Sequence, residues 1–216
     1  MILSYLQLRL YVGIIGVLLP WVLFIGNWAD GHGVQPSLSG YYYTPMRNIF
    51  VGALWGIAVF LVAYNGYDRA DGIITNIAGA CAFAVALCPT TPNNPALHQV
   101  VIGDLHLASA CVAFTLLAVM ALRFANHEPT PTDLTFKQAL GYAFGLTRAA
   151  SAGTPRWAVI TYRVCGFTIL ACVALIYPGS RVYAYSLLIL ETILLTAFGV
   201  SWFIKGRKAL IGRVTA

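Results

Sequence analysis

The feature that most constrains the fold is a series of long apolar runs that recur along the chain. A helix needs roughly 20 apolar residues to cross a bilayer core of about 30 Å, and in lipid each helix satisfies its own backbone hydrogen bonds. The runs also lack the period-2 alternation of a barrel strand. We therefore expect an all-α, integral membrane protein whose six-helix transmembrane bundle forms one domain over residues 1–216. The expected spans are about 9–28, 48–66, 72–89, 104–124, 157–177 and 183–204.

Composition supports a membrane location. Hydrophobic residues make up 59% of the chain and charged residues only 9%, whereas a soluble domain carries roughly 25% charged residues. The formal net charge of +6 does not require nucleic acid, because basic residues gather in the cytoplasmic loops of membrane proteins. We expect membrane lipids, and protein partners within the membrane, rather than nucleic acid.

Lysine and arginine predict the orientation of the bundle. If the N-terminus is cytoplasmic, only Arg47 and Arg181 fall in the outer segments, and Arg163 lies within a span near its inner end, where its side chain can reach the headgroups. The positive-inside rule then places both termini in the cytoplasm. The inner basic residues are Arg9, Arg69, Arg123, Lys137, Arg148, Arg156, Lys205, Arg207, Lys208 and Arg213.

A polar and aromatic stretch, SGYYYTPMRN over residues 39–48, precedes the second span on the outer side. Thr44 and Pro45 are typical of a helix start, and tyrosines suit a membrane interface. An aromatic belt before a capped helix explains the stretch, and so does a ligand site that other outer polar residues complete. The candidate ligand-binding residues are Tyr41, Tyr42, Tyr43, Arg47, Asn48, Asp104, His106, Ser109 and Glu191.

Glu191 is the most informative of these residues because it lies within the last span. A carboxylate near the bilayer centre costs about 2.5–3.5 kcal/mol on insertion scales. It therefore needs a partner or a proton. We expect Arg47 to reach down to it, with the tyrosines closing over the pair, and His106 is the alternative partner.

Known catalytic patterns are missing. The chain has no phosphate-binding GxxxxGK[ST], no HExxH and no GxSxG, so no catalytic residue and no cofactor are predicted. His32, His98 and His106 are weak candidates for a metal site with Asp30 or Asp104. We expect a non-enzymatic binding, sensing or complex-stabilising module with an outward-facing polar pocket for a lipid headgroup or small amphiphile. The alternatives are a metal-dependent lipid hydrolase and a transporter that is proton-coupled through Glu191.

Two further segments carry expectations about packing. A short helix over 134–148 is expected to lie on the membrane surface, with Thr132 and Asp133 as its cap. In the second span, Gly52, Ala53 and Gly56 form a small-residue face that allows close helix packing.

Several motifs together resemble a known family. They are SGYYYTPMRNIFVGALWGI, GYDRADGIITNIAGACAFAVALCPT, HLASACVAF, TYRVCGF and ETILLTAFGVSWFIKG. The chain is similar in these to a family of bacterial multi-pass, six-helix membrane proteins with no assigned function and a YYYT-type segment before helix two. The resemblance implies the bacterial inner membrane and no particular reaction. A looser likeness is to the alkaline ceramidase and adiponectin-receptor superfamily of membrane hydrolases.

The predicted orientation has a direct test. Cysteine replacing Ser37 should react with a membrane-impermeant thiol reagent in intact cells, and cysteine replacing Thr215 should not, because the first position is external and the second cytoplasmic. The unmodified chain, whose five cysteines all lie in apolar runs, sets the background. The reverse pattern of labelling would contradict the assignment.

Overall fold

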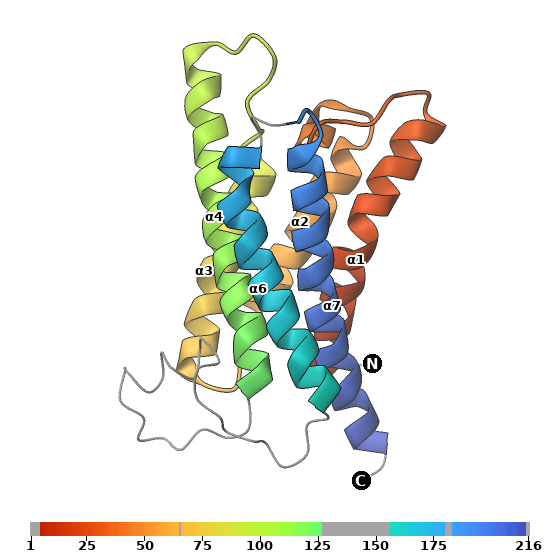
Figure 1. Cartoon of the computed structure of the whole chain (residues 1–216), viewed down its shortest axis with the longest axis vertical. Coiled ribbons are helices and arrows are strands. Elements are labelled where there is room, and N and C mark those ends of the chain that lie inside the picture. The colour runs from red at the N-terminus through yellow and green to blue at the C-terminus, as the bar shows by residue number, and fades with distance from the viewer. Residues whose placement is uncertain (1–4, 65, 127–155, 180–182, 215–216) are drawn as a thin grey trace.

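The computed structural model describes residues 5–64, 66–126, 156–179 and 183–214, and within these ranges it is all-helical. The six α-helices lie side by side along one direction (Figure 1), which confirms the expected helical fold class. The elements are α1 (Tyr5–Ala29), the short 3₁₀ helix η1 (Ser39–Tyr43), α2 (Arg47–Val62), α3 (Arg69–Leu87), α4 (Leu97–Asn126), α6 (Arg156–Gly179) and α7 (Ser186–Val214).

Five of these helices, α1, α3, α4, α6 and α7, are long and apolar enough to cross a membrane. The exception is α2, which has 16 residues and is therefore about 24 Å long at 1.5 Å per residue. A membrane protein with several apolar helices is thus confirmed, while the count of six spans stays a prediction.

The helix ends differ from the expected spans where turn residues intervene. Helix α2 ends at Val62 rather than at residue 66, because the chain turns there and Gly66 adopts a φ of +60°. Helix α4 begins at Leu97, seven residues before the expected start, and the Gln99 side chain accepts a hydrogen bond from the Ala96 amide. The expected surface helix over 134–148 lies outside the described residues.

The six helices form a closed ring. Neighbours pack in the order α1, α2, α3, α4, α6, α7 and back to α1, and α4 also contacts α7 across the ring. The contact between α1 and α7 is the most extensive in the ring, and the contact between α1 and α2 is the slightest. The chain therefore closes the bundle by joining its first helix to its last.

Glycines allow this closure. A Cβ atom on Gly199 of α7 would lie 2.6 Å from the Val17 amide nitrogen and 2.7 Å from the Gly13 carbonyl oxygen of α1, so only glycine permits this approach of the two backbones. The small-residue face expected in the second span is not packed in this way: a Cβ on Gly52 would meet nothing within 4 Å.

Buried aromatic side chains fill the core of the helix bundle toward the end where α1 begins. The Trp202 ring of α7 lies 5.2 Å from the Tyr64 ring and 5.5 Å from the Phe124 ring, and the Phe124 ring lies 5.8 Å from the Tyr162 ring. The three pairs are edge-on, as aromatic quadrupoles prefer. This core joins the end of α2 to α4, α6 and α7.

The polar segments gather at the two ends of the bundle. The loop over residues 30–46, which includes η1, lies at the end opposite to the first turn of α1 and the last turn of α7 (Figure 1). The turn between α2 and α3 lies at the same end as the start of α1. Any functional site built from polar side chains therefore belongs to one end or the other.

Substitution of Gly199 by alanine should destabilise the protein, because the new methyl group meets backbone atoms of α1 that cannot move aside. Overpacking of this kind costs about 1–3 kcal/mol of unfolding free energy, measurable by thermal unfolding in detergent. Gly52→Ala is the matched control, and it should leave the unfolding temperature nearly unchanged. Equal effects of the two substitutions would contradict the role of the α1–α7 contact.

Candidate functional site

The loop before α2 is fastened to α7 by hydrogen bonds in both directions. The Leu188 amide of α7 donates to the Pro36 carbonyl at 3.0 Å. The Leu38 amide donates to Glu191 Oε2 at 2.5 Å, and the Ser39 hydroxyl donates to Oε1 at 3.5 Å. Glu191, which is partly buried, therefore has hydrogen-bond donors from the loop as its partners.

The expected pair of Glu191 and Arg47 is wrong. Within the part of the chain that the structure describes, Arg47 makes no ion pair. Its guanidinium donates to the Tyr42 hydroxyl at 2.6 Å and lies 4.3 Å from the centre of the Tyr42 ring. Arg47 is exposed at the first turn of α2, and so is Asn48. The physical reason is that the Leu38 amide and the Ser39 hydroxyl already bond to the Glu191 carboxylate, which leaves Arg47 at the surface.

The three tyrosines of η1 have different surroundings. Tyr41 is fully buried, and burial raises the pKa of its phenol above the ordinary value, so it is a neutral part of the core. Tyr43 is exposed and donates its hydroxyl to the Thr90 carbonyl at 2.6 Å, which ties the loop to the α3–α4 connection. Only Tyr42 and Tyr43 present aromatic surface beside Arg47.

Thr44 does not cap α2 as expected. Helix α2 begins at Arg47, and its N-cap position is Met46, which makes no side-chain capping bond. The Thr44 hydroxyl instead accepts from the Met46 amide at 3.1 Å and donates to the Tyr41 carbonyl. The first turn of α2 therefore keeps amide groups that can favour an anion.

His106 has a structural partner of its own. This buried side chain of α4 lies with Nδ1 2.6 Å from the Cys88 carbonyl and 3.1 Å from the Val85 carbonyl. Both carbonyls belong to the last turn of α3, where helical acceptors lack partners within the helix, so Nδ1 carries the proton. Ser109 is buried one turn further along α4, whereas Asp104 is exposed.

The weak metal candidates are not brought together. His32 contacts its neighbour Asp30, His98 is exposed, and His106 bonds to the end of α3. Among the described residues, no three His, Cys, Asp or Glu side chains are placed to hold a metal ion. The ligand set of the hydrolase alternative is therefore not assembled in this part of the chain.

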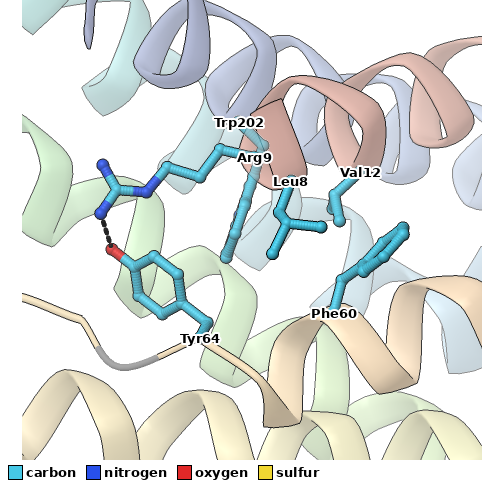
Figure 2. Close-up of a pocket in the computed structure, with 6 residues that line it drawn as sticks. All are labelled: Leu8, Arg9, Val12, Phe60, Tyr64 and Trp202. Atoms are coloured by element: carbon cyan, nitrogen blue, oxygen red, sulfur yellow. Dashed lines mark hydrogen bonds between the residues drawn. The ribbon is translucent and has the colours of Figure 1, made fainter. Parts of the chain in front are cut away.

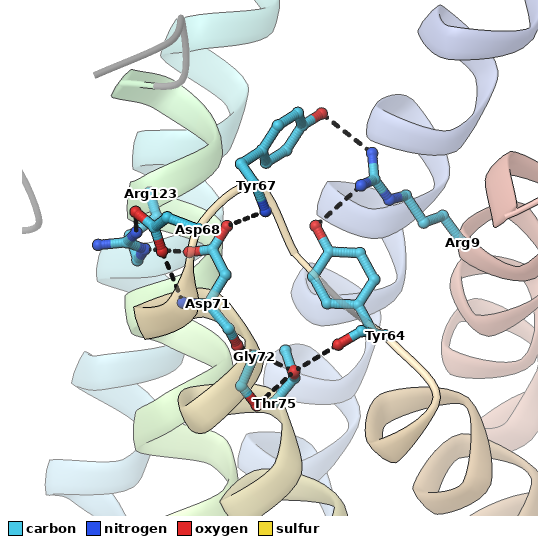
Figure 3. A network of polar contacts seen from close by, with 8 residues as sticks. All are labelled: Arg9, Tyr64, Tyr67, Asp68, Asp71, Gly72, Thr75 and Arg123. Atoms are coloured by element: carbon cyan, nitrogen blue, oxygen red, sulfur yellow. Dashed lines mark hydrogen bonds and ion pairs between the residues drawn. The ribbon is translucent and has the colours of Figure 1, made fainter. Parts of the chain in front are cut away.

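The end of the bundle opposite to the loop holds a polar network that the sequence analysis did not single out (Figure 3). Asp68 caps α3 by accepting from the Asp71 amide at 2.8 Å, and Asp71 accepts from the Tyr67 amide at 3.0 Å. Arg123 of α4 makes ion pairs with both carboxylates, at 2.6 Å in the case of Asp68. Because Asp71 is fully buried, Arg123 neutralises a carboxylate that would otherwise be costly.

Arg9 of α1 is the second charged centre of this network. Its side chain is only 5% exposed, and its terminal nitrogens donate to the hydroxyls of Tyr64 and Tyr67, each at 3.0 Å (Figures 2 and 3). The side chain lines a cleft between α1, α2 and α7. From the sequence alone, Arg9 indicated only the expected orientation of the bundle.

A signal for this network was present in the sequence. The GYDRAD turn places two carboxylates three residues apart, the spacing of a reciprocal helix cap. Arg9, Arg123 and Lys205 all occur near the ends of apolar runs. The partly exposed Arg163 is less informative: its Nε atom is buried and has no hydrogen-bond partner within the described ranges.

Comparison of the chain with protein-family models, with curated proteins and with solved structures found no match. The resemblance to bacterial six-helix membrane proteins therefore stays a prediction.

Because Glu191 bonds to the loop before α2 and not to Arg47, we expect its mutational coupling to be with Ser39. Glu191→Ala and Ser39→Ala should each lower the unfolding temperature in detergent, and the double variant should lose less than the sum. The expected coupling for residues in contact is about 0.5–3 kcal/mol. Glu191→Ala combined with Arg47→Gln is the control, and its effects should add within about 0.5 kcal/mol. Strong coupling of Glu191 to Arg47, with none to Ser39, would contradict the observed contacts.

Proposed function

We propose that this protein is a non-enzymatic module of the bacterial inner membrane that binds a lipid headgroup or small amphiphile at its outer face. In this proposal α2 also crosses the membrane, with η1 extending its short span, and both termini are cytoplasmic. The arrangement of the loop and the termini at opposite ends of the bundle (Figure 1) and the basic residues of the inner segments support this orientation.

The observation that carries the proposal is the state of Arg47. Its guanidinium is exposed and rests on the Tyr42 ring, and within the described residues it has no carboxylate partner. An arginine presents planar donors that match phosphate and carboxylate groups. The amides in the first turn of α2 add partial positive charge to the same place. These features favour an anionic headgroup.

The neighbouring tyrosines fit an amphiphile rather than a free ion. Tyrosine places an apolar ring and a polar hydroxyl at the level of the headgroups, and Tyr42 and Tyr43 pack edge-on with their ring centres 5.3 Å apart. The loop that carries them is held in place through Glu191 and through Thr90. The binding surface would thus be preorganised before the ligand arrives, which lowers the entropic cost of binding.

The test is a titration of the purified chain in detergent with short-chain phosphatidylglycerol and, separately, short-chain phosphatidylcholine. The anionic lipid should raise the unfolding temperature more than the zwitterionic one, and Arg47→Gln should reduce its apparent affinity about tenfold, or about 1.4 kcal/mol. Tyr42→Phe should weaken binding as well, since it removes the hydroxyl that orients Arg47.

Arg69→Gln is the matched control, because it removes an exposed arginine at the start of α3, at the opposite end of the bundle. It should leave the affinity unchanged. An identical response of the unmodified chain and of Arg47→Gln to the anionic lipid would contradict the proposal.

For the cysteine-labelling test of orientation, Val34, which is 53% exposed, is a better cysteine position than Ser37, which is 6% exposed.

A further inference from the structure

Arg9 has more hydrogen-bond donors than the described part of the chain has acceptors for them. A guanidinium group carries five N–H donors, and Arg9 uses one bond to Tyr64 and one to Tyr67. Its Nε atom is buried without a partner among the described residues. A group that is 95% buried and incompletely bonded is costly, so an additional acceptor would stabilise it.

The charge of Arg9 also lacks an anion within the described residues. Its two hydrogen-bond partners are neutral phenols, and the guanidinium carbon lies 4.8 Å and 5.0 Å from the centres of the Tyr64 and Tyr67 rings. The carboxylates closest in sequence to Tyr67 are those of Asp68 and Asp71, and both are bonded to Arg123. A second cation, the Lys205 ammonium, lies 4.9 Å from the Tyr67 ring. The surroundings of Arg9 therefore favour a negatively charged ligand.

An apolar cleft adjoins the arginine (Figure 2). Arg9 and Tyr64 lie at its polar side, and the rest of its lining is Leu8, Val12, Phe60 and Trp202. It lies between α1, α2 and α7, at the slightest helix contact of the ring, and it is too narrow to admit a water molecule. A hydrocarbon chain would therefore lie over its outer edge, on the half-buried side chains of Leu8 and Phe60.

We propose that Arg9 and this cleft bind an anionic phospholipid from the leaflet at the end of the bundle where α1 begins. The phosphate would accept from the terminal N–H donors of Arg9 that the two tyrosines leave unused, and the first part of an acyl chain would lie against Leu8 and Phe60, above the buried Trp202. Tyr67, which is 52% exposed, marks the side from which a headgroup reaches the guanidinium. A free phosphate ion would supply the same acceptors but would leave the apolar surface of Leu8 and Phe60 uncovered. This site is separate from the one proposed at Arg47.

Trp202 makes the site measurable. The full chain is reconstituted in phosphatidylcholine vesicles that contain an equal small fraction of either brominated phosphatidylglycerol or brominated phosphatidylcholine. Bromine quenches tryptophan only at close range, and subtraction of the signal of Trp202→Phe isolates the contribution of Trp202 from the other four tryptophans. We expect stronger quenching of Trp202 by the brominated anionic lipid.

Arg9→Gln should reduce the quenching by the brominated anionic lipid to the level of the zwitterionic lipid. We expect its affinity for the anionic lipid to be about tenfold weaker. Arg9→Lys, which keeps the positive charge, should retain part of the difference between the two lipids. The matched control is Arg69→Gln, which removes an exposed arginine at the start of α3, at the same end of the bundle. Arg47→Gln should also leave Trp202 quenching unchanged, so a failure here and a failure at the outer face are distinguishable.

Equal quenching of Trp202 by the two brominated lipids in the unmodified chain would overturn the proposal. This comparison does not depend on whether any arginine variant folds. Unchanged preference for the anionic lipid in Arg9→Gln would overturn it as well. Addition of inorganic phosphate separates the two sources of the anion. Loss of the anionic preference at modest phosphate concentration would show a phosphate site in place of a lipid site.

Discussion

The close approach of α1 and α7 is the contact on which the rest of the structure depends. Glycines at the crossing let the two backbones touch, and this joins the first and last helices of the chain into a closed ring. The contact places Arg9 of α1 beside Trp202 of α7 at one end. At the other end it brings the loop that follows α1 over α7, where Glu191 accepts its amides. Both candidate sites are consequences of this one helix pair.

Buried charge is handled in three different ways within the bundle. Asp71 is neutralised by an ion pair with Arg123. Glu191 is held by amide and hydroxyl donors of the loop, and Arg9 by two phenols and their rings. Of these three arrangements only the first brings opposite charges together, since donors and ring faces stabilise an ion without supplying a counter-charge. This difference is the reason that we propose an anionic ligand for Arg9 and not for the Asp71–Arg123 pair.

The partners of the candidate residues around the loop before α2 were predicted in part. Glu191 was correctly expected to need partners, because a carboxylate within an apolar run is costly wherever the fold places it. The choice of Arg47 was wrong, because the actual donor is the main-chain amide of Leu38. Every residue except proline carries such an amide, so no pattern of side chains reveals which amide a loop presents. His106 illustrates the same limit: its partners are the carbonyls at the end of α3.

The sequence by itself determined the helical class and the approximate position of each of the six α-helices in the described ranges, because apolar length and backbone hydrogen bonding in lipid leave little choice. It also determined the sites of turns, through glycine, proline and aspartate. Only the tertiary structure decided which helices are neighbours, since the same apolar faces can pack in several orders. The order of the helices then decided which partner each polar group contacts. Arg9 meets Tyr64 and Tyr67 because the ring sets α1 beside the end of α2, and no spacing within the chain expresses that contact.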